Sequence, residues 1–215
     1  MTGLDLRTGR PIIDESTTPQ SVENAAFACP HLLGGKNQPS GAYSPDTNAM
    51  YMPLNNACMD IAMSVEEAGP SDGYDVRVTV RHLPGVDPDT ADIGRLEATS
   101  ASTGETLWTY EQRAPVYGSV LTTGGNLVFS GGSNDREFRA LNATTGKKLW
   151  AMRLNSGVMA VPISYSIDGV QYIAVQAGWG VDAETMQASF NITGKDKTVV
   201  PTDGAIWVFA LKDKK

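Results

Sequence analysis

Residues 98–108, "ATSASTGETLW", return 42 positions further on as residues 140–150, "ALNATTGKKLW". Between Trp108 and Trp150 the sequence reads as three short apolar runs, separated by a Gly-Gly pair and by a polar turn. A repeat of roughly 40–50 residues that contains four short strands is typical of one β-propeller blade. Because one such sheet cannot bury both faces alone, we expect neighbouring blades to stack, with each repeated Trp docked between them.

Three further stretches follow the same pattern. Residues 157–180 read as alternating strands with an Asp168-Gly169 hairpin turn, and residues 204–212, "GAIWVFALK", supply a last strand. Residues 4–12, "LDLRTGRPI", resemble another copy of the repeated turn. The sequence therefore predicts an all-β fold, a partial β-propeller of about three four-stranded blades. Because complete propellers need at least about four blades, we expect this chain to be part of a larger ring.

Residues 61–94 interrupt the repeat. This stretch has seven acidic residues, three basic or potentially basic residues and three prolines. Prolines are rare inside central strands, so the stretch does not read as a continuous part of a blade. We expect an acidic insertion that leaves the propeller sheet at about 61–94, with "YDVRVTV" at residues 74–80 as a strand within it.

The composition excludes several classes of protein. With 41% hydrophobic residues among 215, the chain can bury a real core. The net charge of -7 and the lack of a basic cluster argue against a nucleic-acid partner. No stretch reaches the roughly 20 apolar residues that a transmembrane helix needs, and the N-terminus lacks the apolar run of a signal peptide. We therefore expect a protein without a transmembrane segment.

Both cysteines lie near the ends of one loop-rich stretch, residues 29–58, "CPHLLGGKNQPSGAYSPDTNAMYMPLNNAC". Neither cysteine has the neighbouring Cys or His spacing of a zinc site. In a reducing compartment they would be two ordinary thiols. In an oxidising compartment they could form a disulfide, for which chain entropy gives a stabilisation of about 3.6 kcal/mol. The residues alone leave both alternatives open.

Taken together, this Cys-containing stretch, the two Trp-ending turns, residues 124–150 and residues 162–180 resemble the C-terminal part of the quinoprotein alcohol dehydrogenases. The resemblance runs from about Leu4 to Leu211. Members of that family are periplasmic eight-bladed propellers that use pyrroloquinoline quinone and a Ca²⁺ or lanthanide ion. The resemblance implies that residues 1–215 form the C-terminal segment of such a propeller domain, in the periplasm.

The resemblance also implies roles for individual residues. The family has a disulfide that pairs a Cys-Pro cysteine with the cysteine of a "CMD" motif, which corresponds to Cys29 and Cys58. Eight positions after the first cysteine the family has an asparagine that hydrogen-bonds the quinone, and Asn37 stands there. An amide offers a donor and an acceptor without adding charge. The alternative is that Asn37 only stabilises the Gly-rich turn.

Two other stretches correspond to parts of the family's cofactor site. Methanol dehydrogenases have a Trp in contact with the cofactor where this sequence has Tyr117, so we expect Tyr117 either to contact the cofactor or to face the core. The segment "AGWGVDAE" corresponds to a stretch whose backbone reaches the polar rim of the cofactor. The candidates there are Trp179, Gly180 and Asp182.

The family's catalytic aspartate and its metal ligands lie in earlier blades, so we expect no catalytic or metal-binding residue in this chain. In the sequence, neither His31 nor His82 stands in a pattern that supports a Ser-His or a metal site. The chain would then be inactive alone and need its missing N-terminal blades. The complete enzyme would oxidise a small alcohol or an aldehyde and pass electrons to cytochrome c or another acceptor. The alternative is a non-catalytic propeller scaffold, of the outer-membrane assembly type, that binds protein partners.

Overall fold

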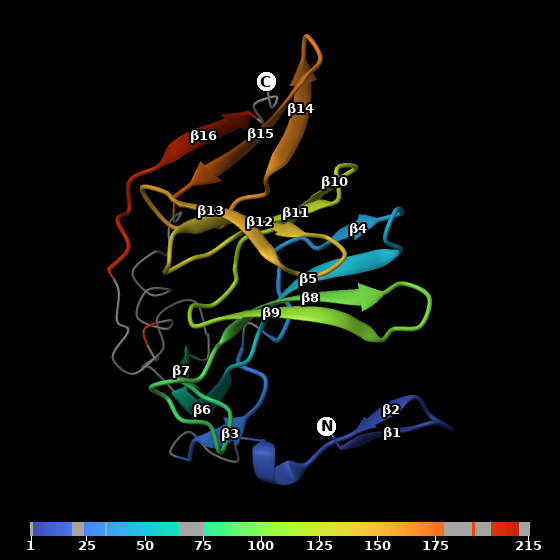
Figure 1. The fold of residues 1–215 in the computed structure, drawn as a ribbon. Coiled ribbons are helices and arrows are strands. Elements are labelled where there is room, and N and C mark those ends of the chain that lie inside the picture. The colour runs from blue at the N-terminus through green and yellow to red at the C-terminus, as the bar shows by residue number, and fades with distance from the viewer. Residues whose placement is uncertain are drawn as a thin grey trace, which may run out of the picture.

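The computed structural model describes residues 2–18, 24–32, 34–64, 75–178, 191 and 199–210. Nearly all regular structure in these residues is antiparallel β-sheet, and Figure 1 shows three of the sheets stacked one above another. The predicted all-β fold is confirmed, and the stacked antiparallel sheets have the arrangement of neighbouring β-propeller blades. No helix in the described ranges has the length and apolarity to cross a membrane.

Two of the stacked sheets have four strands each. The first contains, in spatial order, β4 (Ala42–Ser44), β5 (Ala49–Asn55), β8 (Gly94–Ser100) and β9 (Thr106–Gln112). The second contains β10 (Val120–Thr123), β11 (Leu127–Gly131), β12 (Glu137–Asn142) and β13 (Lys148–Arg153). The 42-residue repeat therefore corresponds to one complete blade, and both Trp-ending turns lead into the last strand of their sheet.

The third stacked sheet has three strands among the described residues. These are β14 (Ile163–Ile167), β15 (Val170–Ala177) and β16 (Ala205–Ala210). Asp168 and Gly169 both have positive φ angles, of 51° and 80°, as a two-residue hairpin turn of the favoured twist requires. The hairpin predicted there is confirmed. Residues 4–12 also form a hairpin, made of β1 (Gly3–Asp5) and β2 (Arg10–Ile12), which pairs with no other described strand.

The stretch with the acidic insertion leaves the first blade and returns to it. Strand β5 ends at Asn55, β6 (Cys58–Ser64) and β7 (Asp75–Arg81) pair with each other, and the chain re-enters the blade at β8. Strand β3 (Ala26–Ala28) adds to the free side of β6, after the short 3-10 helix η1 (Glu15–Thr17). These three strands form a separate small sheet beside the blades (Figure 1). The predicted strand within the insertion is β7.

The repeated Trp and Gly of the "TGxxLW" turn pack against each other across neighbouring blades. The indole Nε1 of Trp108 donates a hydrogen bond of 2.8 Å to the carbonyl of Ala143, in the turn of the next sheet. A Cβ on Gly146, which has a φ of 70°, would lie 2.6 Å from the Trp108 ring. Gly146 therefore supplies both the left-handed turn and the space for the preceding blade's Trp. The predicted docking of Trp108 is confirmed.

Trp150 occupies the equivalent place in the second blade. Its ring meets Phe209 of β16 edge-on, with centroids 5.2 Å apart, and also touches Phe138. It is 39% exposed, whereas Trp108 is partly buried against the core. Trp150 thus packs between two sheets as predicted, but less of its surface is covered than that of Trp108.

The core lies between the stacked sheets, as propeller geometry requires. One buried cluster joins the first and second sheets, with Tyr51 and Leu96 on one side and Val128 and Leu141 on the other. A second cluster joins the second and third sheets, and Phe138 lies at its centre. Each inter-sheet layer is continuous, so the position of one blade fixes that of its neighbour.

Candidate functional site

An open pocket of about 400 Å³ lies where the loop before β4 meets the segment before β10. The loop forms one wall, the segment before β10 a second wall, and the chain between β13 and β14 a third. The lining residues are Asn37, Gln38, Pro39, Ser40, Tyr117, Ser119, Met159 and Val161. Asn37 and Tyr117, which are far apart in the sequence, thus line the same pocket.

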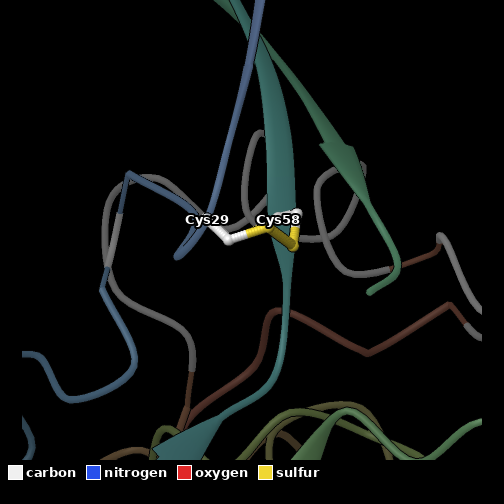
Figure 2. Close-up of a disulfide and its surroundings, with 2 residues drawn as sticks. All are labelled: Cys29 and Cys58. Atoms are coloured by element: carbon white, nitrogen blue, oxygen red, sulfur yellow. A yellow bond between two sulfur atoms is a disulfide. The ribbon is translucent and has the colours of Figure 1, made fainter. Parts of the chain in front are cut away.

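The loop wall is attached to the start of β6 by a disulfide. Cys29 and Cys58 are joined, with their Cα atoms 4.4 Å apart, and Figure 2 shows the bridge between the loop and the strand. The backbone N–H of His31 also donates to the carbonyl of Ala57 at 2.7 Å. The cysteine pairing that the resemblance implied is confirmed. It fixes the beginning of the loop that carries Asn37.

The orientation of the Asn37 amide follows from its contacts. The backbone N–H of Gln38 donates to Asn37 Oδ1 at 2.7 Å, and a backbone donor needs an oxygen acceptor, so this contact identifies Oδ1. Within the described residues, Asn37 Nδ2 has no acceptor. Lys36 Nζ donates to the carbonyls of Asn37 and Pro39, at 2.7 and 2.6 Å, which closes the loop around the amide. Asn37 therefore presents a hydrogen-bond donor on a braced loop.

The second wall is held by close backbone contacts. A Cβ on Gly94 would lie 2.9 Å from the nitrogen of Val116, and one on Gly118 would lie 2.6 Å from the carbonyls of Gly131 and Val158. Only glycine permits such approach at these positions. The segment that carries Tyr117 is therefore packed against β8 on one side and against the second blade on the other.

Tyr117 is both a core residue and a pocket residue. It is 7% exposed, and burial raises the pKa of its hydroxyl, so the side chain stays protonated and neutral. The two expectations for Tyr117, a core position and a place in the candidate site, are therefore compatible.

The two walls are also joined directly. The backbone N–H of Ser40 donates to Ser119 Oγ at 2.9 Å, and the N–H of Val120 donates to the carbonyl of Ser40 at 2.9 Å. These bonds connect the end of the loop to the start of β10. Because both ends of the loop are attached, its central residues have little freedom to move relative to Tyr117.

Trp179, Gly180 and Asp182 lie outside the described residues. The residue before them, Gly178, donates its backbone N–H to the carbonyl of Gly157 at 2.8 Å and forms a bridge with Val158. Since Met159 lines the pocket, the end of β15 approaches the third wall.

The described ranges contain no group of three His, Cys, Asp or Glu side chains that could hold a metal ion. Asp60 forms an ion pair with Arg81, at 2.6 Å, in the small sheet. His31 is buried, and desolvation lowers the pKa of its imidazole. Asp60 and His82 line a second, wider recess of about 750 Å³ over the small sheet, away from Asn37. Among the described residues, none of these groups lines the pocket that contains Asn37.

Several pocket residues were not predicted from the sequence. Ser40 and Ser119 supply hydroxyls, and Met159 and Val161 supply an apolar wall. In the sequence, only their positions could have suggested that these residues line the pocket. Ser119 follows Tyr117 closely, and Met159 precedes a predicted strand. The described lining residues offer neutral donors and an apolar surface, and none of them is a carboxylate. This arrangement suits a flat ligand with carbonyl and carboxylate oxygens.

Comparisons with known proteins agree with this geometry. Residues 90–173 match a family model described as glucose/ethanol/alcohol dehydrogenase, beta-propeller domain. The chain is 36% identical over 190 residues to quinoprotein alcohol dehydrogenase PedH of Pseudomonas putida, which covers 83% of this chain and 30% of that protein. It is 33% identical over 217 aligned residues to a quinoprotein ethanol dehydrogenase of Pseudomonas putida, which covers 97% and 33%.

A solved structure gives the same result. A europium-containing methanol dehydrogenase superposes on 97% of this chain and 38% of its own, with a TM-score of 0.79 and 27% sequence identity. The chain spans about a third of the length of the curated relatives it matches.

Proposed function

Because this chain carries part of the β-propeller of the quinoprotein alcohol dehydrogenase family, we propose that its pocket is one wall of a site for pyrroloquinoline quinone. The single observation that carries the proposal is that Asn37 and Tyr117 line the same pocket. These were the two candidate cofactor residues within the described part of the chain. A structural role for Asn37 in the turn alone would not require it to line the same pocket as Tyr117.

The lining fits the chemistry of this ligand. A quinone with several carboxylates is repelled by acidic side chains, and the described residues that line the pocket include none. Lys36 adds a positive charge to the loop that carries Asn37, without itself lining the pocket. Asn37 Nδ2 would donate to a ligand oxygen, Tyr117 would contact the ligand with its neutral ring, and Met159 and Val161 would exclude water from the apolar side. When bound, the quinone supplies the hydride acceptor.

The rest of the reaction requires groups that the described residues do not provide. No described cluster fits a Ca²⁺ or lanthanide ion, so we propose that this metal and the catalytic base are held by other blades of the ring. The complete protein would oxidise a small primary or secondary alcohol, or an aldehyde, in the periplasm. It would pass the electrons to cytochrome c or another acceptor. No observation on the described residues favours the protein-binding scaffold.

Replacing Asn37 by Ala is expected to weaken quinone binding about tenfold. The loss of one hydrogen bond of ordinary strength costs about 1.4 kcal/mol of binding free energy, which corresponds to a tenfold rise in the dissociation constant. Asn37→Asp should weaken binding further, because it replaces a donor by a negative charge that faces carboxylates. The measurement is equilibrium dialysis of the quinone against the chain assembled with its missing blades.

Asn56→Ala is the matched control for this experiment. Asn56 lies outside the pocket, and its side chain forms no hydrogen bond within the described ranges. The Asn56→Ala protein should bind the quinone with the same affinity as the unchanged protein. Equal affinities for Asn37→Ala and Asn56→Ala would show that Asn37 serves only the turn.

A further inference from the structure

Asn55, the last residue of β5, is hydrogen-bonded to both walls of the pocket. Its backbone N–H donates to the carbonyl of Gly35 at 2.8 Å, in the loop that carries Asn37. Its side chain makes two bonds to Val116, the residue before Tyr117. Nδ2 donates to the Val116 carbonyl at 3.2 Å, and Oδ1 accepts from the Val116 N–H at 2.8 Å.

We propose that Asn55 is the positioning residue that sets the distance between the Asn37 loop and the Tyr117 segment. Asn55 does not line the pocket and acts through the two backbone segments that do. The identity of the ligand rests on the proposed function, whereas the spacing of the walls does not.

An asparagine side chain is suited to this task. Its amide pairs with both the donor and the acceptor of Val116, as a neighbouring strand would. Asn55 is 8% exposed and Val116 is 1% exposed, so water has little access to either side of this pair. An Asp could accept from the Val116 N–H but could not donate to its carbonyl. An Ala would leave both polar groups of Val116 without their partner.

The surrounding packing makes this contact decisive for position. Gly94 and Gly118 bring the Val116 segment close to neighbouring backbone, and the two bonds from the Asn55 amide attach it to the end of β5. On the other wall, the disulfide and the His31–Ala57 hydrogen bond hold the start of the loop, and the bond from Asn55 to Gly35 attaches it again before Asn37. One residue therefore transmits the position of β5 to both walls.

Hydrogen exchange of the 215-residue chain, followed by mass spectrometry of peptides, tests the positioning role. Asn55→Ala keeps the backbone bond to Gly35 but loses both side-chain bonds to Val116, so amide exchange is expected to rise at least tenfold in residues 113–119 and to stay unchanged in β11 and β12. Asn55→Asp keeps the acceptor for the Val116 N–H but turns a carboxylate oxygen toward the Val116 carbonyl, so it should also raise exchange in residues 113–119. Asn56→Ala, the neighbouring residue of the same type, should leave exchange in residues 113–119 unchanged.

Two outcomes would overturn the inference. A uniform rise throughout the chain would mean that Asn55 contributes only to overall stability, and no rise in residues 113–119 would mean that its side chain does not hold the Val116 segment. If Asn55→Ala fails to fold, the Asn55→Asp result decides between these outcomes in the same way.

Quinone affinity provides an independent readout of the same role. In the chain assembled with its missing blades, Asn55→Ala should raise the dissociation constant for pyrroloquinoline quinone about tenfold, although Asn37 is intact. If the unchanged protein takes up no quinone, the proposed function fails, while the exchange experiment still tests the spacing of the walls. If the quinone binds equally well to Asn55→Ala, Asn55 does not position this site.

Discussion

Replacing Cys29 and Cys58 together by Ala is expected to lower the free energy of unfolding by about 3.6 kcal/mol. The disulfide joins residues 29 positions apart, so its loss lets the unfolded chain sample many more conformations of the intervening loop. Cys58 is also fully buried, so solvent does not reach its side chain. Urea unfolding, followed by circular dichroism, measures the difference between the two proteins.

Treatment with a reducing agent is the control for this prediction. It should destabilise the unchanged chain by a similar amount and leave the double variant unaffected. The double substitution of Cys29 and Cys58 should also weaken quinone binding, because the loop that carries Asn37 would lose its attachment at Cys29. A double variant that unfolds at the same urea concentration as the unchanged chain would contradict the bracing role of the disulfide.

Replacing Phe138 by Ala is expected to lower the free energy of unfolding by about 3–5 kcal/mol. Phe138 is fully buried between the second and third sheets. Its ring lies 5.7 Å from the rings of both Phe129 and Phe209, measured between centroids. Removing the ring would leave a cavity that these rigid neighbours cannot close, in the cluster that includes Val158 beneath the pocket.

Leu149→Ala is the matched control for Phe138→Ala. Leu149 lies on the adjacent strand β13 but is 53% exposed, so its truncation should change stability by only about 0.5 kcal/mol. Thermal and urea unfolding of both variants measure the comparison. If the two truncations cost the same, the layer between the second and third sheets is not the main core of this part of the chain.

Local sequence signals predicted the blades well. The 42-residue repeat located both four-stranded sheets, because each "TGxxLW" turn combines a Gly that the left-handed backbone requires with a Trp that needs a neighbouring sheet. Trp108 and Gly146 meet across that boundary. The Asp168-Gly169 pair likewise fixed one hairpin. In each case a short-range requirement determines the structure, so a single sequence is enough to reveal it.

The candidate site was harder to predict because it depends on contacts between distant residues. The sequence suggested Asn37 and Tyr117 only through the resemblance, and nothing local showed that Met159 would face them. The pairing of β3 with β6 and the two-sided bonding of Asn55 are also long-range. Side-chain amides have no periodic signature, so the role of Asn55 becomes visible only when both walls are in place.

The most direct test of the account is quinone uptake by the assembled propeller. The chain would be combined with its missing blades, loaded with Ca²⁺ or a lanthanide, and dialysed against pyrroloquinoline quinone. We predict saturable uptake of one quinone by the assembly and no saturable uptake when this chain is left out. An assembly that forms a single species in gel filtration yet takes up no quinone would contradict the proposal that Asn37 and Tyr117 form one wall of the cofactor site.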